Sequence, residues 1–134
     1  LLLSALDARV HAACIGGYLT SHLHTFLDCA HCTCGYVRDL ARYFEHVDLA
    51  ALIAPRPLFL DSGRRDPEFP SAEAKKVVRQ LRPVYRLFRQ PQASLGIEIH
   101  EGAHEIAGRK SIPWLLARLR ESPCQSARLT PQWK

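Results

Sequence analysis

Short apolar runs alternate along the chain with longer stretches in which apolar residues repeat at helical spacing. The apolar runs predict three buried strands, at 10–15, 57–61 and 95–99. The helical spacing predicts the end of a helix at 1–6 and further helices at 37–44, 49–53, 71–89 and 112–119. Because strands alternate with helices, the pattern predicts an α/β fold in which three parallel strands are flanked by helices.

Several residues mark the expected boundaries of these helices. Asp48 is expected to cap the helix at 49–53, which must end before Pro55. Ser71 is expected to cap the long helix at 71–89. Pro83 lies inside that helix and is expected to kink or break it, because proline lacks a backbone N–H and its ring clashes with the preceding turn.

The chain of 134 residues is long enough for one domain or for part of one. We expect residues 1–121 to form the folded portion. Residues 122–134 contain two prolines and scattered polar side chains, and we expect them to form a loose tail. The sequence contains no methionine, and Leu1 to Leu3 resemble the end of a helix more than the start of a chain. We therefore interpret the sequence as a fragment.

Composition narrows the class of protein. Hydrophobic residues make up 47% of the chain and charged residues 23%, which is typical of globular domains and excludes a collagen-like repeat, a coiled coil or a disordered tail. No apolar run is long enough to cross a membrane, so we expect no membrane partner. The five cysteines do not form the even framework of small secreted domains, so we expect a reduced, cytoplasmic protein.

The formal net charge is +5, and part of it lies on the predicted helix at 71–89. Basic residues repeat there every three or four positions, at Lys75, Arg79, Arg82, Arg86 and Arg89. Such a stripe can attract nucleic acid, but it is more often the solvated face of an outer helix. The aromatic residues of this segment, Tyr85 and Phe88, belong to the apolar stripe, so no aromatic platform accompanies the basic one and we expect no nucleic-acid partner.

An acid and an imidazole follow the second and third predicted strands. Asp66 lies in the polar loop after the second strand, and His104 lies just past the third. Because parallel strands end at the same edge of a sheet, we expect the two side chains to meet there. A carboxylate that orients an imidazole, which then acts as a general base, makes up two thirds of a nucleophilic triad. We therefore predict that Asp66 and His104 are catalytic residues.

Each candidate residue also has a simpler interpretation. Asp66 is of a type that commonly forms turns before proline, and His104 is in a place where surface histidines occur. His100 is a competing base, because it lies closer to the predicted strand. Tyr18 follows the first strand and either lines a substrate pocket or only packs against its neighbours. We treat it as a candidate substrate-binding residue.

Four segments carry a family resemblance. They read G-R-R-D-P-E-F-P at 63–70, E-G-A-H-E at 101–105, A-P-R-P-L at 54–58 and H-C-T-C-G-Y-V at 31–37. In this order they resemble the acid loop, the histidine loop, the strand entry and a further loop of α/β-hydrolases in the dienelactone hydrolase and acetyl xylan esterase-like branch. Ala103 and Gly35 depart from that branch's glycine and asparagine. The resemblance implies the C-terminal part of an α/β-hydrolase fold, with Asp66 as acid and His104 as base.

The motif that holds the nucleophile of this superfamily is absent. The nucleophilic serine lies in G-x-S-x-G at a strand-to-helix turn, and no serine here has that setting, although Ser62 in Asp61-Ser62-Gly63 comes nearest. The resemblance implies that the nucleophile precedes Leu1. We therefore expect part of a serine hydrolase of esterase type, inactive alone, that acts on small-molecule carboxylic or acetyl esters without a cofactor. The alternative is a truncated or pseudo-hydrolase that serves as a binding module.

A cluster of histidines and cysteines offers another hypothesis. Candidate zinc ligands lie close together at His22, His24, Cys29, His31, Cys32 and Cys34. The single residue between Cys32 and Cys34 is a tighter spacer than zinc sites usually have, and no second pair of ligands follows. We therefore expect no metal, and small buried cysteines beneath a loop. A zinc-stabilised module is the alternative.

Overall fold

The computed structural model describes residues 1–28 and 35–121. The elements follow in the order α1 (Leu2–Leu6), β1 (Ala13–Gly16), a π-helical turn (Leu23–Leu27), α2 (Leu40–Tyr43), α3 (His46–Ala51), β2 (Leu58–Gly63), α4 (Ser71–Leu87), a 3-10 turn (Gln92–Ser94), β3 (Leu95–His100) and α5 (Ser111–Glu121). None of the helices in the described ranges is both long enough and apolar enough to cross a bilayer. The expected tail at 122–134 lies outside the described residues.

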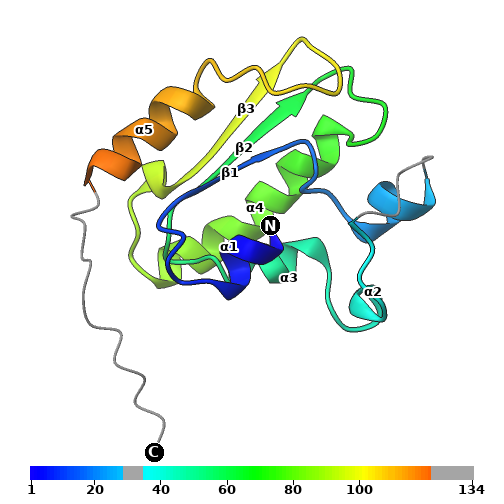
Figure 1. The fold of residues 1–134 in the computed structure, drawn as a ribbon, viewed down its shortest axis with the longest axis horizontal. Coiled ribbons are helices and arrows are strands. Elements are labelled where there is room, and N and C mark those ends of the chain that lie inside the picture. Colours follow the sequence, from blue (N-terminus) through cyan, green and yellow to red (C-terminus); the bar gives the residue numbers. More distant parts are fainter. Residues whose placement is uncertain (29–34, 122–134) are drawn as a thin grey trace, which may run out of the picture.

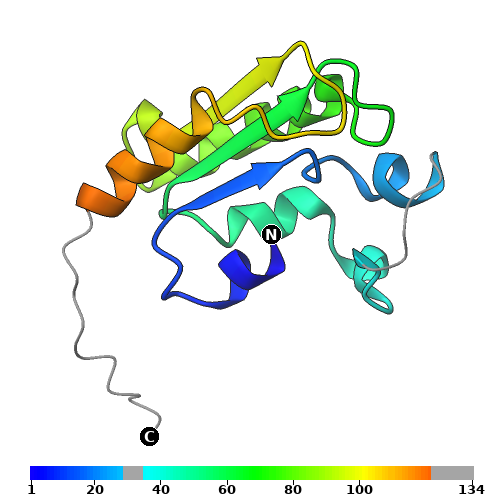
Figure 2. The ribbon, with the colours of Figure 1, turned by 45° about the horizontal axis from the view of Figure 1, so that its top comes forward.

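The three strands form one parallel sheet in the order β1-β2-β3. Ala13 is paired with Leu58, and Leu58 with Leu95, so the strands start level with one another. Figures 1 and 2 show α1, α3 and α4 on one face of the sheet and α5 on the other. The predicted α/β fold, with three parallel strands and flanking helices, is therefore confirmed. The first strand begins at Ala13, later than the apolar run that predicts it.

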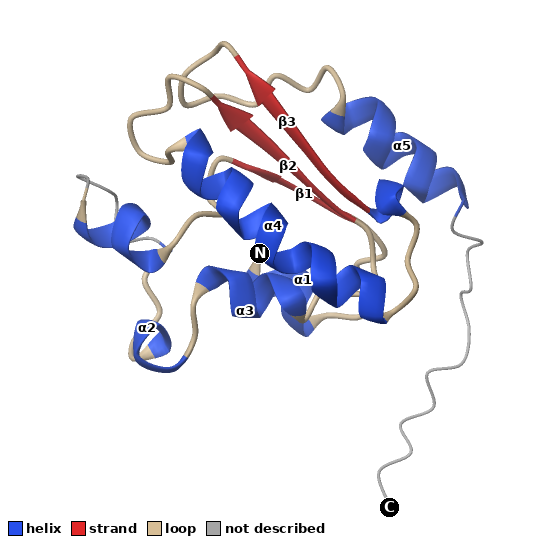
Figure 3. Ribbon diagram, turned by 180° about the vertical axis from the view of Figure 1, so that it is seen from behind, coloured by secondary structure: helices blue, strands red, loops and turns tan. Residues whose placement is uncertain are grey.

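The core lies where the sheet meets α3 and α4, on the face seen in Figure 3. All six residues of β2 are buried, because helices cover both faces of this central strand. Its apolar side chains Leu58 and Leu60 belong to one core cluster with residues of the neighbouring segments, among them Ile15, Ile53, Val77 and Leu81. The packing fixes β2 at the centre of the fold, and with it the loop that follows.

Helix α4 differs from the sequence prediction in two respects, at Pro83 and at Ser71. It runs without a break from Ser71 to Leu87, through Pro83. Proline costs a helix about 3 kcal/mol, and burial of the apolar stripe on α4 outweighs that cost. The buried residues of this stripe are Ala74, Val77, Val78, Leu81 and Tyr85. Ser71 is the first helical residue and makes no capping hydrogen bond, because Pro70 occupies the cap position.

Helix α3 differs from the sequence prediction in its bounds and in its cap. It begins at His46 and ends at Ala51, earlier than the predicted 49–53. Glu45, not Asp48, occupies the cap position, and the Glu45 N–H donates to Asp48 Oδ2 over 2.8 Å. Asp48 therefore belongs to the first turn as the partner residue of a capping box. Helix α2 is also shorter than the predicted 37–44, because Asp39 has a φ of +61°, in the left-handed region, so the helix begins only at Leu40.

Leu58→Ala is expected to lower the free energy of unfolding by about 2–5 kcal/mol, because Leu58 is 0% exposed at the centre of the core and its removal leaves a cavity. Urea denaturation followed by circular dichroism measures this. Leu6→Ala is the matched control, since Leu6 is 77% exposed and should change stability by less than about 0.5 kcal/mol. Equal losses in both variants would contradict the described packing.

Candidate active site

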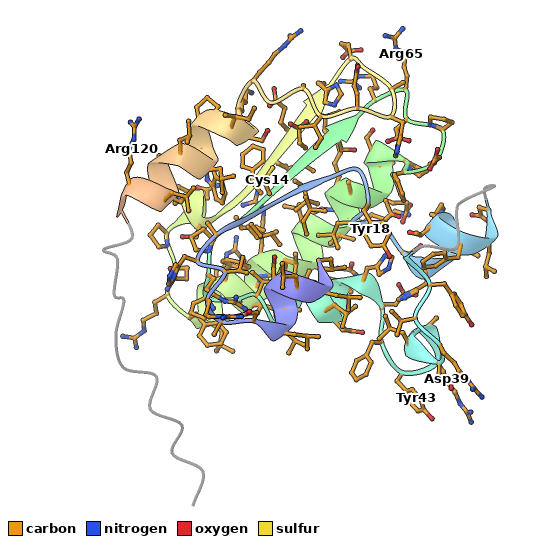
Figure 4. All side chains as sticks on the ribbon, in the orientation of Figure 1. Cys14, Tyr18, Asp39, Tyr43, Arg65 and Arg120 are labelled. Atoms are coloured by element: carbon orange, nitrogen blue, oxygen red, sulfur yellow. The ribbon has the colours of Figure 1, made fainter. Side chains whose placement is uncertain are left out.

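Backbone hydrogen bonds join the loops that follow β2 and β3. The Arg64 N–H donates to the carbonyl of His100 over 2.8 Å, and the Arg65 N–H donates to the carbonyl of Gly102 over 3.0 Å. The Arg65 side chain adds a bond of 2.7 Å from Nε to the carbonyl of Glu101. Figure 4 shows Arg65 at this end of the sheet. The bonds continue the pairing of β2 with β3 past the strands, so the two loops keep a fixed spacing.

Gly63, the last residue of β2, lets the two loops approach closely. A Cβ at this position would overlap the carbonyl oxygen of Ala103, the residue before His104. Only a residue without a side chain allows the loop that carries His104 to lie directly over the end of β2. The acid loop begins at the same glycine, so Gly63 governs the distance between the acid and the histidine.

Asp66 and His104 form a hydrogen-bonded pair. Asp66 Oδ2 lies 3.1 Å from His104 Nδ1, and the Asp66 side chain is only 2% exposed. The other oxygen, Oδ1, accepts the N–H groups of Glu68 at 2.9 Å and Phe69 at 3.0 Å. A carboxylate only accepts, so the bond assigns a proton to His104 Nδ1 and leaves Nε2 of the neutral ring unprotonated. An unprotonated Nε2 is the form that a general base requires.

The free nitrogen of His104 is accessible. The His104 side chain is 52% exposed, and within residues 1–28 and 35–121 no group hydrogen-bonds to its Nε2. The ring of Phe69 lies beside the imidazole, with 5.4 Å between the ring centroids. His104 borders a pocket of about 190 Å³, whose other lining residues are Gly16, Gly17, Asp66, Glu105 and Ile106. The pocket and the acid–histidine pair therefore form one site.

The β1 side of this pocket consists of two glycines. Gly17 has a φ of +65°, in the left-handed region, and a Cβ there would lie 2.9 Å from the Phe69 ring. A Cβ on Gly16 would lie 2.5 Å from the side chain of Ile106. Gly17 therefore requires glycine, whereas a side chain at Gly16 would require Ile106 to move, and β1 contributes backbone to the pocket rather than side chains.

His100, the competing base, has a different environment from His104. Its side chain is 5% exposed, and both ring nitrogens have partners. Nδ1 lies 3.0 Å from the N–H of Gly102, and Nε2 lies 3.1 Å from the carbonyl oxygen of Glu105. His100 has no free nitrogen to take a proton from a substrate or nucleophile. Of the two histidines, His104 is the one whose geometry suits a general base.

Tyr18 lies beside the pocket and is not among the residues that line it. Its ring packs against those of His46 and Phe69, with centroid distances of 4.8 and 5.7 Å. Its hydroxyl lies 3.4 Å from the carbonyl oxygen of Gly35, and burial raises the pKa of this phenol. Tyr18 therefore supports Phe69, which in turn contacts His104. Its expected contact with substrate stays a prediction.

The histidine and cysteine cluster is described only in part, because Cys29, His31, Cys32 and Cys34 lie outside the described residues. His22 Nδ1 lies 3.2 Å from a carboxylate oxygen of Glu45, and His24 Nδ1 lies 2.8 Å from the hydroxyl oxygen of Ser21. In the described ranges, no three histidine, cysteine or acidic side chains are grouped so that they could hold a metal ion.

The chain is similar to solved structures in its fold alone. No protein family and no curated protein matches the sequence. A carbohydrate esterase family 15 glucuronoyl esterase from Caldicellulosiruptor kristjansonii is similar in structure, with a TM-score of 0.63 and 18% identity over 98% of this chain and 42% of that one. TT1662 from Thermus thermophilus is also similar, with a TM-score of 0.59 and 21% identity over 91% of this chain and 50% of that one. The present chain thus spans half or less of these proteins, and the likeness supports an α/β-hydrolase-like fold.

Sequence reasoning missed two contributors to the site. Phe69 supplies a backbone N–H to Asp66 and a ring to His104. An aromatic residue within an otherwise polar loop is a signal that could have pointed to it. Gly16 and Gly17 form one side of the pocket, and paired glycines directly after a strand indicate a close approach of backbone to another group.

Gly63→Ala is expected to separate the two loops. The added methyl group overlaps the Ala103 carbonyl, so the free energy of unfolding should fall by about 1–3 kcal/mol and the Asp66–His104 hydrogen bond should be lost. Urea denaturation measures the first effect. The NMR signal of the His104 Nδ1 proton measures the second. A variant that keeps this signal and the stability of the parent chain would show that the loops do not depend on Gly63.

The stability of the chain is expected to depend on pH through His46, whose ring packs against that of Tyr18. It is buried, its Nδ1 donates to the carbonyl of Thr20 over 3.0 Å, and its ring centroid lies 4.1 Å from that of His22. Burial, with a smaller contribution from the charge of His22, lowers its pKa from the ordinary 6.5 to about 4. The folded chain therefore keeps His46 neutral at a pH where the unfolded chain protonates it.

The stability that depends on neutral His46 is fully present above pH 6.5 and is lost as the pH falls toward 4. His46→Asn keeps a donor for the Thr20 carbonyl but does not titrate in this range. The variant should therefore reduce the slope of unfolding free energy against pH, by up to about 1.4 kcal/mol per pH unit. Urea titrations at several pH values measure the slope. His11→Asn, at an exposed position, should leave it unchanged.

Proposed function

We propose that this chain supplies the acid and the general base of a serine hydrolase of esterase type. The observation that carries the proposal is the Asp66–His104 pair, in which a buried carboxylate orients an accessible imidazole beside a pocket. The pair lies after adjacent parallel strands, where ligands of open α/β sheets bind. The similarity in fold to a glucuronoyl esterase agrees with this assignment.

In the proposed reaction, His104 Nε2 removes the proton of a serine hydroxyl as the serine oxygen attacks the ester carbonyl. The Asp66 carboxylate stabilises the imidazolium that results. When the carbon–oxygen bond of the ester breaks, His104 returns the proton to the leaving alcohol. A water molecule, deprotonated in the same way, then hydrolyses the acyl-enzyme. These steps use side chains and water alone, so the proposal includes no cofactor.

We place the nucleophile on a segment that precedes residue 1. No serine in the 134 residues lies in G-x-S-x-G, and Ser62 is buried inside β2. The similar proteins are at least twice as long as the aligned part, which is consistent with a larger catalytic unit. The open edge of β1, next to Gly16 and Gly17, is where a further parallel strand would bring a serine toward His104.

The proposed substrates are small carboxylic esters, including acetyl esters. Their class rests on the resemblance of the acid and histidine loops and on the similar fold. The pocket of about 190 Å³ beside His104 has room for a small acyl group. A catalytically inactive binding module is the second candidate, and it is favoured by one observation. Among the described residues, no hydroxyl or thiol group hydrogen-bonds to His104 Nε2.

The test is hydrolysis of p-nitrophenyl acetate by the complete polypeptide that contains residues 1–134. His104→Ala and Asp66→Asn should each lower kcat/KM by about 10³–10⁴-fold, because each removes a member of the triad. His11→Ala and Asp39→Asn, at exposed positions away from the pocket, are the matched controls. Residues 1–134 alone should show no hydrolysis above the solvent rate.

Full activity in either site variant would remove that residue from its proposed role. The binding-module alternative makes a different prediction. The complete polypeptide would then hydrolyse no ester, yet a non-hydrolysable phosphonate analogue of the acetate ester would still shift the NMR signals of His104.

A further inference from the structure

The loop that carries His104 is built around a second imidazole, that of His100. The Gly102 N–H donates to His100 Nδ1 over 3.0 Å, and His100 Nε2 lies 3.1 Å from the carbonyl oxygen of Glu105. His104 lies between Gly102 and Glu105 in the sequence. One buried ring therefore binds the backbone on both sides of the candidate base.

These two contacts determine which nitrogen of His100 carries the proton. Nδ1 accepts an N–H, so it is unprotonated, and Nε2 faces a carbonyl oxygen, so it donates. The ring is therefore neutral, with its proton on Nε2. His104 has the opposite tautomer, with its proton on Nδ1 facing Asp66.

A buried carboxylate lies close to Nε2 of His100. Asp61, in β2, is 0% exposed, and its Oδ1 lies 3.4 Å from His100 Nε2. This contact is an ion-pair distance and not a hydrogen bond, because Oδ1 has no hydrogen-bonding partner among the described residues. The other oxygen, Oδ2, accepts the Gly108 N–H at 2.9 Å and the Ser111 hydroxyl at 2.6 Å. Asp61 therefore connects the His104 loop to the start of α5, and a carboxylate at this depth is stable only with such partners.

We propose that Asp61 and His100 form a positioning pair that fixes the loop 100–105 and so holds His104 against Asp66. The proposal rests on the proposed function for its catalytic meaning, while its structural part is measurable on this chain alone. Neither residue lines the pocket, so both act through the loop rather than on a substrate. A shift of about 1 Å in a catalytic group can cost about 10²-fold in rate, which is the scale of effect expected from loosening the loop.

Asp61→Asn distinguishes this pair from simple packing, because it keeps the shape of the side chain. Two donors, from Gly108 and Ser111, already bind one oxygen of residue 61, so the new NH₂ group would face His100. The Nε2–H of His100 would then oppose another donor. If the proton moved to Nδ1, it would oppose the Gly102 N–H instead. Either tautomer leaves two donors facing each other, so the loop must loosen.

The structural experiment is ¹⁵N NMR of the 134-residue chain labelled at histidine. In the parent chain, His100 should show the Nε2–H tautomer and His104 the Nδ1–H tautomer. In Asp61→Asn and His100→Phe, the His104 Nδ1–H signal should be lost, with unchanged far-ultraviolet circular dichroism. Asp39→Asn and His11→Phe are the matched controls and should keep both signals. An Nδ1–H tautomer at His100 in the parent chain, or an unaltered His104 signal in folded Asp61→Asn, would overturn the proposal.

The kinetic experiment uses the complete polypeptide with p-nitrophenyl acetate. His100→Phe and Asp61→Asn should lower kcat by about 10²-fold with little change in KM. His100→Gln places an amide N–H near the position of Nε2 and should recover part of the loss, whereas His100→Asn does not reach Asp61 and should recover less. Equal activity of the Gln, Asn and Phe variants would overturn the pairing with Asp61.

The two proposals fail in different ways. If the NMR signals behave as expected but the complete polypeptide hydrolyses no ester, the esterase proposal fails and the structural pair stands. If the polypeptide is an active esterase and His100→Phe keeps its full kcat and its His104 signal, the positioning pair fails and the esterase proposal stands.

Discussion

The parallel pairing of β2 with β3 is the constraint on which the site depends. It continues beyond the strands through the backbone bonds of Arg64 and Arg65, so the two loops are extensions of the sheet. Each loop then carries one member of the Asp66–His104 pair. Because side chains alternate between the two faces of a strand, a slip of one residue in this register would turn the buried side chains of β3 outward and move His104 away from its partner. The core around β2 and α4 therefore specifies the chemistry as well as the fold.

Two buried carboxylates of the sheet bind the backbone near the end of the segment that carries His104. Asp61 accepts the Gly108 N–H, and Glu98 accepts the Lys110 N–H over 2.8 Å, so two acids meet the backbone where α5 begins. The N-terminus of a helix carries a partial positive charge, which favours carboxylates at that place. The segment between β3 and α5 is thus held at both of its ends. His104 lies within that segment, so its side chain is accessible to solvent while its backbone is held in place.

The sequence predicted the features that depend on periodicity and on chain order. Three strands were foreseen because their apolar runs are short, and the meeting of Asp66 and His104 followed from parallel strands that end at one edge. The features that the sequence could not predict depend on contacts that are distant in sequence. Pro83 is tolerated because α4 is buried along its stripe, and Tyr18 packs on Phe69, some fifty residues away, beside the pocket. A local pattern contains no information on such packing, so propensity alone misjudged Pro83 and could not identify the packing partners of Tyr18.

The pair of glycines at the end of β1 has a consequence for molecular recognition. Whatever enters the cavity meets peptide groups on that side, whose positions are set by the sheet and cannot adjust by rotamer changes. Selectivity there would come from a rigid wall, with Ile106 and Glu105 as the adaptable surface opposite. A larger residue at Gly17 would be strained at its φ of +65° and would press on the Phe69 ring, whereas substitutions at residues 105 and 106 would alter the surface opposite without replacing the acid or the imidazole.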